Sequence, residues 1–170
     1  GAFHAIMEKM TASAIDYLNY QIDEGVQAIQ IFDSWVGCLS VADYRSHVFA
    51  HSKKLLDSIS GKVPVIHFGT GNPSLLPLMA EAGGDVMALD WRAPLKESWE
   101  LLGCKAVQGN MDPVALFGSV DSVRQAAGLI LEEVGERPGH IFNLGHGILP
   151  ETPVENVKAL VEFVQGYQTS

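Results

Sequence analysis

The chain has 170 residues, of which 47% are apolar and 18% charged, a balance typical of one globular domain or a large part of one. Its formal net charge of −9 makes nucleic acid and anionic membranes poor partners. No run of about 18 apolar residues predicts a membrane span, and residues 1–8 lack the charged and apolar regions of a signal peptide.

Helical and strand-like patterns alternate along the chain. In order, apolar spacing and turn residues predict helix 3–22, strand 28–32, helix 40–61, strand 63–68, helix 72–83, strand 85–89, helix 95–102, strand 106–109, helix 120–134, strand 140–144 and a final helix after residue 153. Gly25 suits the position that follows the first helix, where φ is often positive. Five strands separated by helices imply an α/β fold with parallel strands and helical crossovers.

Three of the predicted helix starts carry capping signals. Residues 40–43 (SVAD) have the spacing of a capping box. Asn72 precedes Pro73, which predicts an N-cap followed by a proline at the first helical position. Residues 152–155 (TPVE) predict a capping box and an N1 proline together at the final helix.

Polar residues gather directly after the predicted strands. They are Asp33 and Ser34, residues 67–72, Asp90 and Trp91, residues 110–112, and His146. The strands themselves are almost continuously apolar, which predicts a sheet buried on both faces. The pattern fits an open doubly wound sheet or a (β/α) barrel, and in both architectures ligands bind at the carboxyl ends of the strands. One rim of a single domain, residues 1–170, is therefore expected to be functional.

A nucleotide-binding loop is disfavoured. Residues 69–71 (GTG) begin like the dinucleotide-binding motif, but Ser74 replaces its third glycine, and no P-loop lysine motif occurs. A lone pair of glycines at this spacing is weak support for a nicotinamide cofactor.

His146 is the strongest single candidate for a ligand-binding residue at the rim. Gly145 and Gly147 flank it, so the backbone there can turn sharply and let a ligand approach closely. An imidazole can donate or accept a hydrogen bond. The alternative is a structural histidine that caps a loop. Ser34 also has two interpretations, a ligand-binding hydroxyl or, more commonly, a cap or turn hydroxyl.

Asp33, His67 and Asp90 are weaker candidates. Either aspartate could serve as a general acid or base, or could accept hydrogen bonds from backbone amides, which is the commoner role. His67 lies within an apolar strand and is expected to be a satisfied core or rim histidine. Side-chain direction separates these roles, and periodicity does not fix it.

The cysteines suggest no disulfide framework. Cys38 and Cys104 form no metal-spaced pair, and both are expected to be small buried side chains in a protein of the reducing cytoplasm. The remaining histidines have no neighbours in the sequence that suggest catalysis: His4, His47, His51 and His140.

Four strand-end segments stand out when they are taken together. They are residues 30–37 (QIFDSWVG), 88–91 (ALDW), 108–113 (QGNMDP) and 142–148 (FNLGHGI). In this order and spacing they resemble the uroporphyrinogen decarboxylase family, and the likeness runs essentially over residues 1–170.

The resemblance implies a (β/α)8 TIM barrel, of which this chain would supply about five parallel strands with outer helices, the fourth to eighth β/α units. It implies a carboxy-lyase of porphyrin and heme biosynthesis that removes four acetate carboxyl groups from uroporphyrinogen III to give coproporphyrinogen III. It further implies a cytoplasmic homodimer that uses neither a metal nor an organic cofactor.

The resemblance also assigns site residues. Ser34 and His146 match the serine and histidine that position substrate carboxylates, and Phe32 would line the same cleft. The family's carboxylate-binding arginines, its pyrrole-contacting aspartate and a cleft tyrosine belong to an amino-terminal half that is missing here. We therefore expect the main acid outside this chain, an inactive fragment, and self-association or partial disorder through two unpaired sheet edges.

Two alternatives remain beside this interpretation. A zinc-dependent methyltransferase of the corrinoid type shares the fold and resembles residues 65–69, but it needs a cysteine where Gly69 stands and another near His146. A non-catalytic tetrapyrrole-binding or assembly module would keep Ser34 and His146 without the main acid and the arginines.

Overall fold

The computed structural model describes residues 1–103 and 106–167. The helices are α1 (Ala2–Asp23), α2 (Val41–His47), α3 (Phe49–Ile59), α4 (Leu76–Ala82), α5 (Leu95–Leu102), α6 (Val120–Val134) and α7 (Val154–Gly166), with short 3-10 turns η1 (Val36–Cys38), η2 (Pro73–Leu75) and η3 (Pro113–Phe117). The strands are β1 (Ile29–Asp33), β2 (Val65–Gly69), β3 (Val86–Ala88), β4 (Ala106–Gln108) and β5 (His140–Ile141). No helix in the described ranges combines the length and apolar character that a membrane crossing requires.

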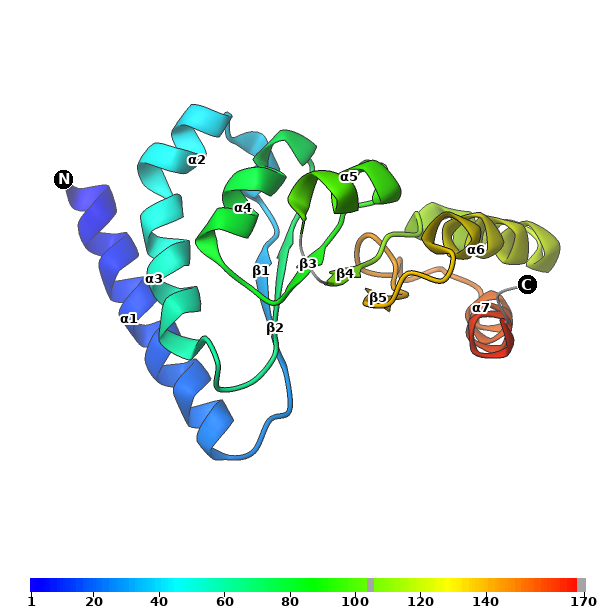
Figure 1. Ribbon diagram of the computed structural model, residues 1–170, viewed down its shortest axis with the longest axis horizontal. Helices are drawn as coiled ribbons and strands as arrows, with labels where there is room; N and C mark the ends of the chain where they lie inside the picture. Colours follow the sequence, from blue (N-terminus) through cyan, green and yellow to red (C-terminus); the bar gives the residue numbers. More distant parts are fainter. Residues whose placement is uncertain (104–105, 168–170) are drawn as a thin grey trace.

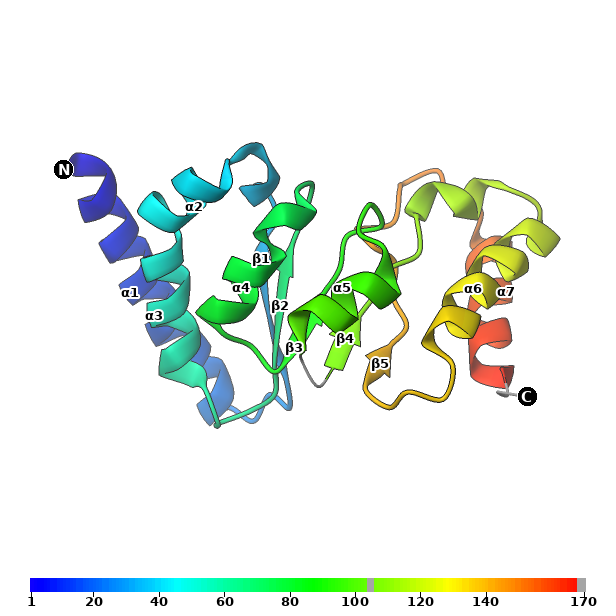
Figure 2. The ribbon, with the colours of Figure 1, turned by 45° about the horizontal axis from the view of Figure 1, so that its top comes forward.

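The five strands form one parallel sheet in sequential order, β1-β2-β3-β4-β5. Its register places Phe32 beside Phe68, Phe68 beside Ala88, Ala88 beside Gln108, and Gln108 beside Ile141. Right-handed crossovers between sequential parallel strands place their helices on one face, and the helices follow one side of the sheet (Figure 1). The first and last helices, α1 and α7, lie at opposite ends of this arc (Figure 2). This arrangement is part of a barrel and not a doubly wound sheet with helices on both faces.

The two faces of the sheet are buried to different degrees. The side chains that point toward the helices are buried: Ile29, Val65, His67, Met87 and Val107. The opposite face, which we call the inner face, carries Gln30, Phe32, Phe68, Ala88 and Gln108 around a hollow. On it Phe32 is 64% exposed and Ile141 is 43% exposed. The prediction of a sheet buried on both faces therefore holds for the middle strands, where Phe68, Ala88 and Gln108 are buried, and is wrong at the two edges, because the described residues supply no strand opposite Phe32.

Four apolar clusters lie in series between the sheet and the helices. The first joins α1 and α3 to β1 and β2 through Leu18, Ile29 and Leu56, and the last joins α6, α7 and η3 through Leu116 and Leu160. Full burial of an aliphatic side chain of this size stabilises a fold by about 1.5–3 kcal/mol. The core is therefore distributed along the arc, one cluster for each junction between neighbouring β/α units.

Most predicted elements are confirmed, and the caps explain where they begin. Ser40 Oγ accepts the backbone N–H of Asp43 at 3.1 Å, and Asn72 Oδ1 accepts that of Ser74 at 3.2 Å. The predicted helix 40–61 is instead two helices, α2 and α3, that meet at Val48. Val48 packs against the core cluster next to α4, so the chain bends there to bury it.

Two predictions near the end of the chain are wrong. The strand expected over 140–144 pairs only over His140–Ile141, followed by one isolated bridge between Met111 and Leu144. Pro153 is the N-cap of α7 and not its first helical residue, and no side chain caps that helix. The hydroxyl of Thr152, predicted as the capping group, is buried without a hydrogen-bond partner among the described residues.

The prediction of buried cysteines is wrong at Cys38, whose side chain is exposed. Cys38 belongs to η1, the short turn after β1, where its Sγ donates to the carbonyl oxygen of Trp35 at 3.1 Å. Cys104, for which the same prediction was made, lies outside the described residues.

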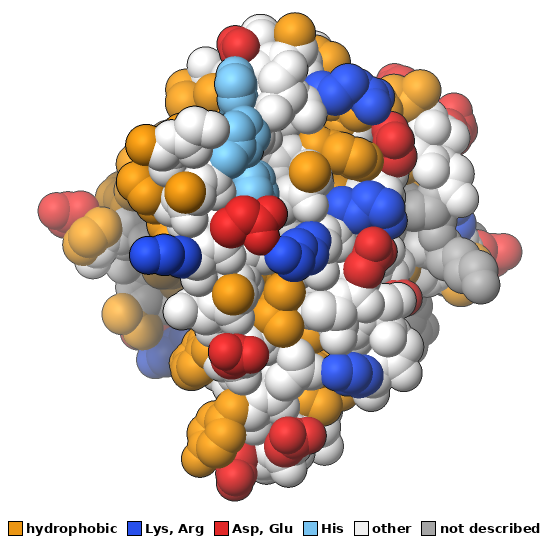
Figure 3. All heavy atoms as spheres, turned by 90° about the vertical axis from the view of Figure 1, so that its left-hand side faces the viewer, with side chains coloured by type: hydrophobic (Ala, Val, Ile, Leu, Met, Phe, Trp, Pro, Cys, Tyr) orange, Lys and Arg blue, Asp and Glu red, His pale blue; other side chains and the backbone are white. Residues whose placement is uncertain are grey.

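The outer surface around α1 and α3 mixes apolar, charged and histidine side chains, and the histidines gather near one end of it (Figure 3). Exposed apolar residues on α1 include Phe3, Ile6, Met10, Tyr17 and Tyr20. His4 Nδ1 lies 3.2 Å from His51 Nε2, and the rings of His4 and His47 have centroids 5.8 Å apart. In the sequence these histidines have no neighbours that suggest catalysis. The packing of α1 on α3 brings them together.

Candidate active site

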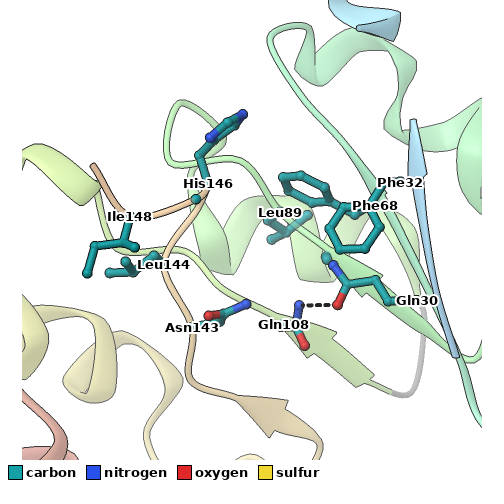
Figure 4. A pocket seen from close by; sticks show the side chains of 11 residues that line it. Gln30, Phe32, Phe68, Leu89, Gln108, Asn143, Leu144, His146 and Ile148 are labelled. Atoms are coloured by element: carbon teal, nitrogen blue, oxygen red, sulfur yellow. Dashed lines mark hydrogen bonds between the residues drawn. The ribbon is translucent and has the colours of Figure 1, made fainter. Parts of the chain in front are cut away.

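The three residues predicted to contact substrate lie around two adjoining hollows at the carboxyl ends of the strands. The first, the inner hollow, measures about 370 Å³ and is lined by Phe32 and His146 among others (Figure 4). The second, the rim hollow, measures about 290 Å³ and is lined by Ser34 and His146. Folding thus brings together residues from β1, at one edge of the sheet, and from the loop after β5, at the other.

Aromatic rings surround His146 on two sides. The His146 ring lies edge-on to Phe68, with centroids 6.4 Å apart, and edge-on to Trp91, with centroids 6.0 Å apart. Phe68 in turn meets Phe32 at 5.9 Å. Edge-to-face pairs of this kind have a defined geometry, so the exposed imidazole stands against fixed apolar walls. Such a site offers a flat apolar surface beside a hydrogen-bonding group.

The loop after β1 is held against the loop after β2. The Thr70 hydroxyl donates to the carbonyl oxygen of Ser34 at 2.6 Å. A Cβ added to Gly37 would lie 2.2 Å from the carbonyl oxygen of Thr70, so this position requires glycine. The loop that carries Ser34 is therefore held at two points, Ser34 and Gly37, while the Ser34 hydroxyl makes no hydrogen bond to another residue in the described ranges.

The loop after β5 packs directly on the loop after β3. Gly145 N–H donates to the carbonyl oxygen of Met111 at 2.7 Å, and a Cβ at Gly145 would lie 2.3 Å from the backbone nitrogen of Trp91. At Gly147 a Cβ would meet nothing within 4 Å. Neither glycine has a positive φ. Close backbone approach, and not a sharp turn, therefore explains the glycine before His146.

The buried carboxylate of Asp90 ties the same loops together. Its Oδ1 accepts the backbone N–H of Arg92 at 2.8 Å, and its Oδ2 accepts the backbone N–H of Gly71 at 3.1 Å and Arg92 Nη1 at 2.7 Å. Its carbonyl oxygen accepts Asn110 Nδ2 at 3.1 Å. Of the two roles predicted for Asp90, the structure shows the commoner one, a carboxylate that accepts backbone amides.

Asp33 and His67 form a pair behind the rim, on the helix side of the sheet. His67 Nδ1 lies 3.1 Å from the carbonyl oxygen of Met79 and 3.2 Å from that of Gly83; because carbonyl oxygens only accept, Nδ1 donates. His67 Nε2 lies 3.0 Å from Asp33 Oδ2. The prediction of a satisfied core histidine is confirmed. Burial, and then the nearby charge of Asp33, raise the pKa of the Tyr44 hydroxyl above its usual range.

Several polar residues of the two hollows were not singled out in the sequence. Gln108 Nε2 donates to Gln30 Oε1 at 3.3 Å across the inner face, and Asn143 lies beside them (Figure 4). The Arg92 guanidinium, in the rim hollow, stacks 3.7 Å from the centroid of the Trp91 ring. Period-two alternation could have found Gln30, two residues before Phe32, whereas Arg92 follows its strand end without any periodic signal.

A family model described as uroporphyrinogen decarboxylase (URO-D) matches residues 1–167. The chain belongs to the uroporphyrinogen decarboxylase family. The uroporphyrinogen decarboxylase of Carboxydothermus hydrogenoformans is 52% identical over 165 residues, which cover 96% of this chain and 47% of that relative. One from Thermus thermophilus is 50% identical over 164 residues, covering 96% and 48%. This member of the family spans about half the length of the curated relatives it matches.

Two solved structures share the fold. A methyltransferase from Methanosarcina mazei superposes with a TM-score of 0.77 at 27% identity, over 91% of this chain and 46% of that one. A dihydrodipicolinate synthase from Bacillus anthracis is 19% identical and superposes with a TM-score of 0.51, over 90% of this chain and 53% of that one. At this identity the likeness shows the fold alone. Both neighbours are proteins of the TIM-barrel type, which confirms the predicted partial barrel.

The geometry around β2 bears on the zinc methyltransferase alternative. Both nitrogens of His67 face protein groups behind the rim. A Cβ at Gly69, where that class needs a cysteine, would lie 2.5 Å from Cε of Met79. In the described part of the chain, no three His, Cys, Asp or Glu side chains are placed to share a metal ion. These positions therefore do not match the zinc pattern of that class.

Proposed function

We propose that this chain is the carboxy-terminal part of a uroporphyrinogen decarboxylase, which removes the four acetate carboxyl groups of uroporphyrinogen III, without a cofactor, to give coproporphyrinogen III. The supporting observation is the convergence of Phe32, Ser34 and His146 on one rim in a chain of this family. A hydroxyl and an imidazole N–H both donate to carboxylate oxygens, so Ser34 and His146 would hold substrate carboxylates. Phe32 would contact the tetrapyrrole ring system.

The decarboxylation chemistry requires more than these residues supply. A proton must reach a pyrrole carbon, and an anionic or dipolar group must stabilise the positive ring as carbon dioxide leaves. Asp33 is bonded to His67, and Asp90 is bonded to two backbone amides and Arg92, so both carboxylates are already engaged. We therefore assign the main acid to the amino-terminal half that the relatives possess, and we expect this chain alone to be inactive.

Domain organisation and partners follow from the same proposal. Residues 1–170 would form the fourth to eighth β/α units of a single barrel domain, and the remaining strands would pair with the free edges of β1 and β5. The whole protein would be a cytoplasmic homodimer that binds uroporphyrinogen III and coproporphyrinogen III. Nucleic acid and membranes are not expected partners, because a net charge of −9 repels nucleic acid and anionic membranes.

The test is anaerobic incubation with uroporphyrinogen III, following the carboxyl count of the products. This chain alone should give no turnover, and mixing it with the amino-terminal half of the Carboxydothermus relative should restore activity. In that mixture His146→Ala should lower kcat/KM at least about tenfold, since it removes a charge-assisted hydrogen bond to substrate. His47→Ala, an exposed histidine on the outer helices, is the matched control and should have no effect.

Each part of the proposal has its own contrary result. Turnover by this chain alone would show that the missing half is not needed. A mixture that is inactive, while the intact relative works under the same conditions, would contradict the decarboxylase assignment. If that inactive mixture still bound uroporphyrin, and His146→Ala abolished the binding, the non-catalytic tetrapyrrole-binding module would be the better description.

A further inference from the structure

We propose that Arg92 is a further carboxylate-binding residue of this site and holds one acidic arm of the substrate in the rim hollow. The inference rests on the proposed function, because the substrate bears eight carboxylates while this chain carries a net charge of −9. Binding such a ligand requires cationic groups at the places where its arms arrive. Among the described residues that line the inner and rim hollows, Arg92 is the one lysine or arginine.

The guanidinium of Arg92 is anchored before any ligand arrives. Arg92 Nη1 donates to Asp90 Oδ2 at 2.7 Å, and Asp90 is itself held by the backbone N–H groups of Gly71 and Arg92. One face of the guanidinium lies 3.7 Å from the centroid of the Trp91 ring. An ion pair and a stacked ring together fix both the position and the plane of the guanidinium group. Less side-chain freedom is then lost when an anion binds.

The other nitrogens of the Arg92 guanidinium remain available to bind a ligand. Arg92 Nε and Nη2 make no hydrogen bond to another described residue, and the side chain is 50% exposed. A planar fork of N–H donors matches the two oxygens of a carboxylate. Ser34 and His146 line the same hollow of about 290 Å³. A carboxylate entering it would therefore meet a guanidinium, a hydroxyl and an imidazole.

The aspartate partner does not cancel this attraction. Asp90 is 4% exposed and its oxygens accept two backbone amides in addition to Arg92. The negative charge thus lies beneath the rim and is already hydrogen-bonded, whereas the positive charge lies at the surface that a ligand reaches. Asp90 acts here as a positioning residue, which aims the guanidinium at the hollow.

The experiment measures binding of uroporphyrin III, the stable oxidised form with the same eight carboxylates, to the complete protein or to the reconstituted mixture described above. Arg92→Gln should raise Kd about tenfold and reduce the slope of log Kd against log salt concentration, since one charge contact is lost. The Kd of Arg92→Lys should lie between those of wild type and Arg92→Gln, because lysine keeps the charge but lacks the planar guanidinium and its stacking on the ring. Arg45→Gln is the matched control, since Arg45 also pairs with a carboxylate and is 56% exposed, but lies on the outer helices.

The controls separate this proposal from the one on which it rests. If His146→Ala weakens binding while Arg92→Gln leaves Kd and the salt slope unchanged, Arg92 is not a binding residue and the proposed function stands. If Arg45→Gln weakens binding as much as Arg92→Gln, the effect is one of overall charge and the assignment fails. If the wild-type protein neither binds uroporphyrin nor turns over uroporphyrinogen III, both proposals fail. Should Arg92→Gln lower the melting temperature, the Kd of Arg92→Lys decides: affinity partly restored by lysine supports binding by the charge, whereas a Kd as high as that of Arg92→Gln would contradict the assignment.

Discussion

The helix-facing and inner faces of the same sheet differ in how their side chains are covered. On the helix side Val65, His67 and Met87 are buried entirely by residues of this chain. On the inner side Phe32 is 64% exposed and lies at the candidate site. In a closed barrel the remaining strands would cover that inner face. The chain therefore builds its own outer core, whereas the edges of its inner face stay exposed at Phe32 and Ile141, as expected of the proposed carboxy-terminal part of a barrel.

The largest expected effect compares one side chain from each face. Leu56→Ala, in the cluster between α3 and the sheet, should lower the free energy of unfolding by about 2–5 kcal/mol, because it leaves a cavity in a closed core. Phe32→Ala should cost less than about 1 kcal/mol, because most of that ring is already in water. Urea unfolding of both variants in this chain, residues 1–170, in which Phe32 has that exposure, measures the difference.

An equal loss of stability in the two variants would contradict the division of roles between the faces. It would mean that the inner face is as firmly packed as the outer one. A loss of uroporphyrin binding in Phe32→Ala with its stability retained would sharpen the division, since binding and stability would then be separated on one strand.

The next effect compares the two glycines beside His146. Gly145→Ala should destabilise by about 1–3 kcal/mol, because its Cβ would lie 2.3 Å from the backbone nitrogen of Trp91 and that backbone must shift. Gly147→Ala should change stability by less than about 0.5 kcal/mol, since no atom lies within 4 Å of its Cβ. Thermal unfolding of the pair tests the claim that contact between two loops positions His146. Similar melting temperatures for the two variants would refute it.

The smallest effect concerns pH. Burial lowers the pKa of His140, an effect partly opposed by its Nε2 hydrogen bond to the carbonyl oxygen of Gly109. The folded state then binds its proton less readily than the unfolded state, so this residue's contribution is present above about pH 6.5 and is lost as pH falls below it. The expected change is less than about 1 kcal/mol between pH 7.5 and 5.5.

The measurement is the free energy of unfolding at the two pH values, for wild type and for His140→Gln. Subtracting the variant removes the contribution of the other histidines, which are common to both proteins. A wild-type protein that loses less stability on acidification than the variant would reverse the sign of this prediction. A difference of the expected sign would confirm that folding partly withdraws His140 from water.

Much of this architecture can be predicted from residues that are near one another in the chain. Alternating patterns locate the five strands and their helices, and local caps such as those of Ser40 and Asn72 mark where helices begin. The strand-end motifs also place Phe32, Ser34 and His146 on one rim, because parallel strands direct their carboxyl ends to the same edge. These inferences depend on local geometry and on a single topological rule.

Contacts between distant segments account for what sequence patterns leave open. Gly145 is required by the backbone of Trp91, Asp90 is turned toward backbone amides and Arg92, and Asp33 is paired with His67 behind the rim. Periodicity cannot assign these partners, because each depends on loops from different strands meeting in space. The alternation of elements was thus fixed locally along the chain, while packing between loops settled which polar groups are buried as supports and which remain free to meet a ligand.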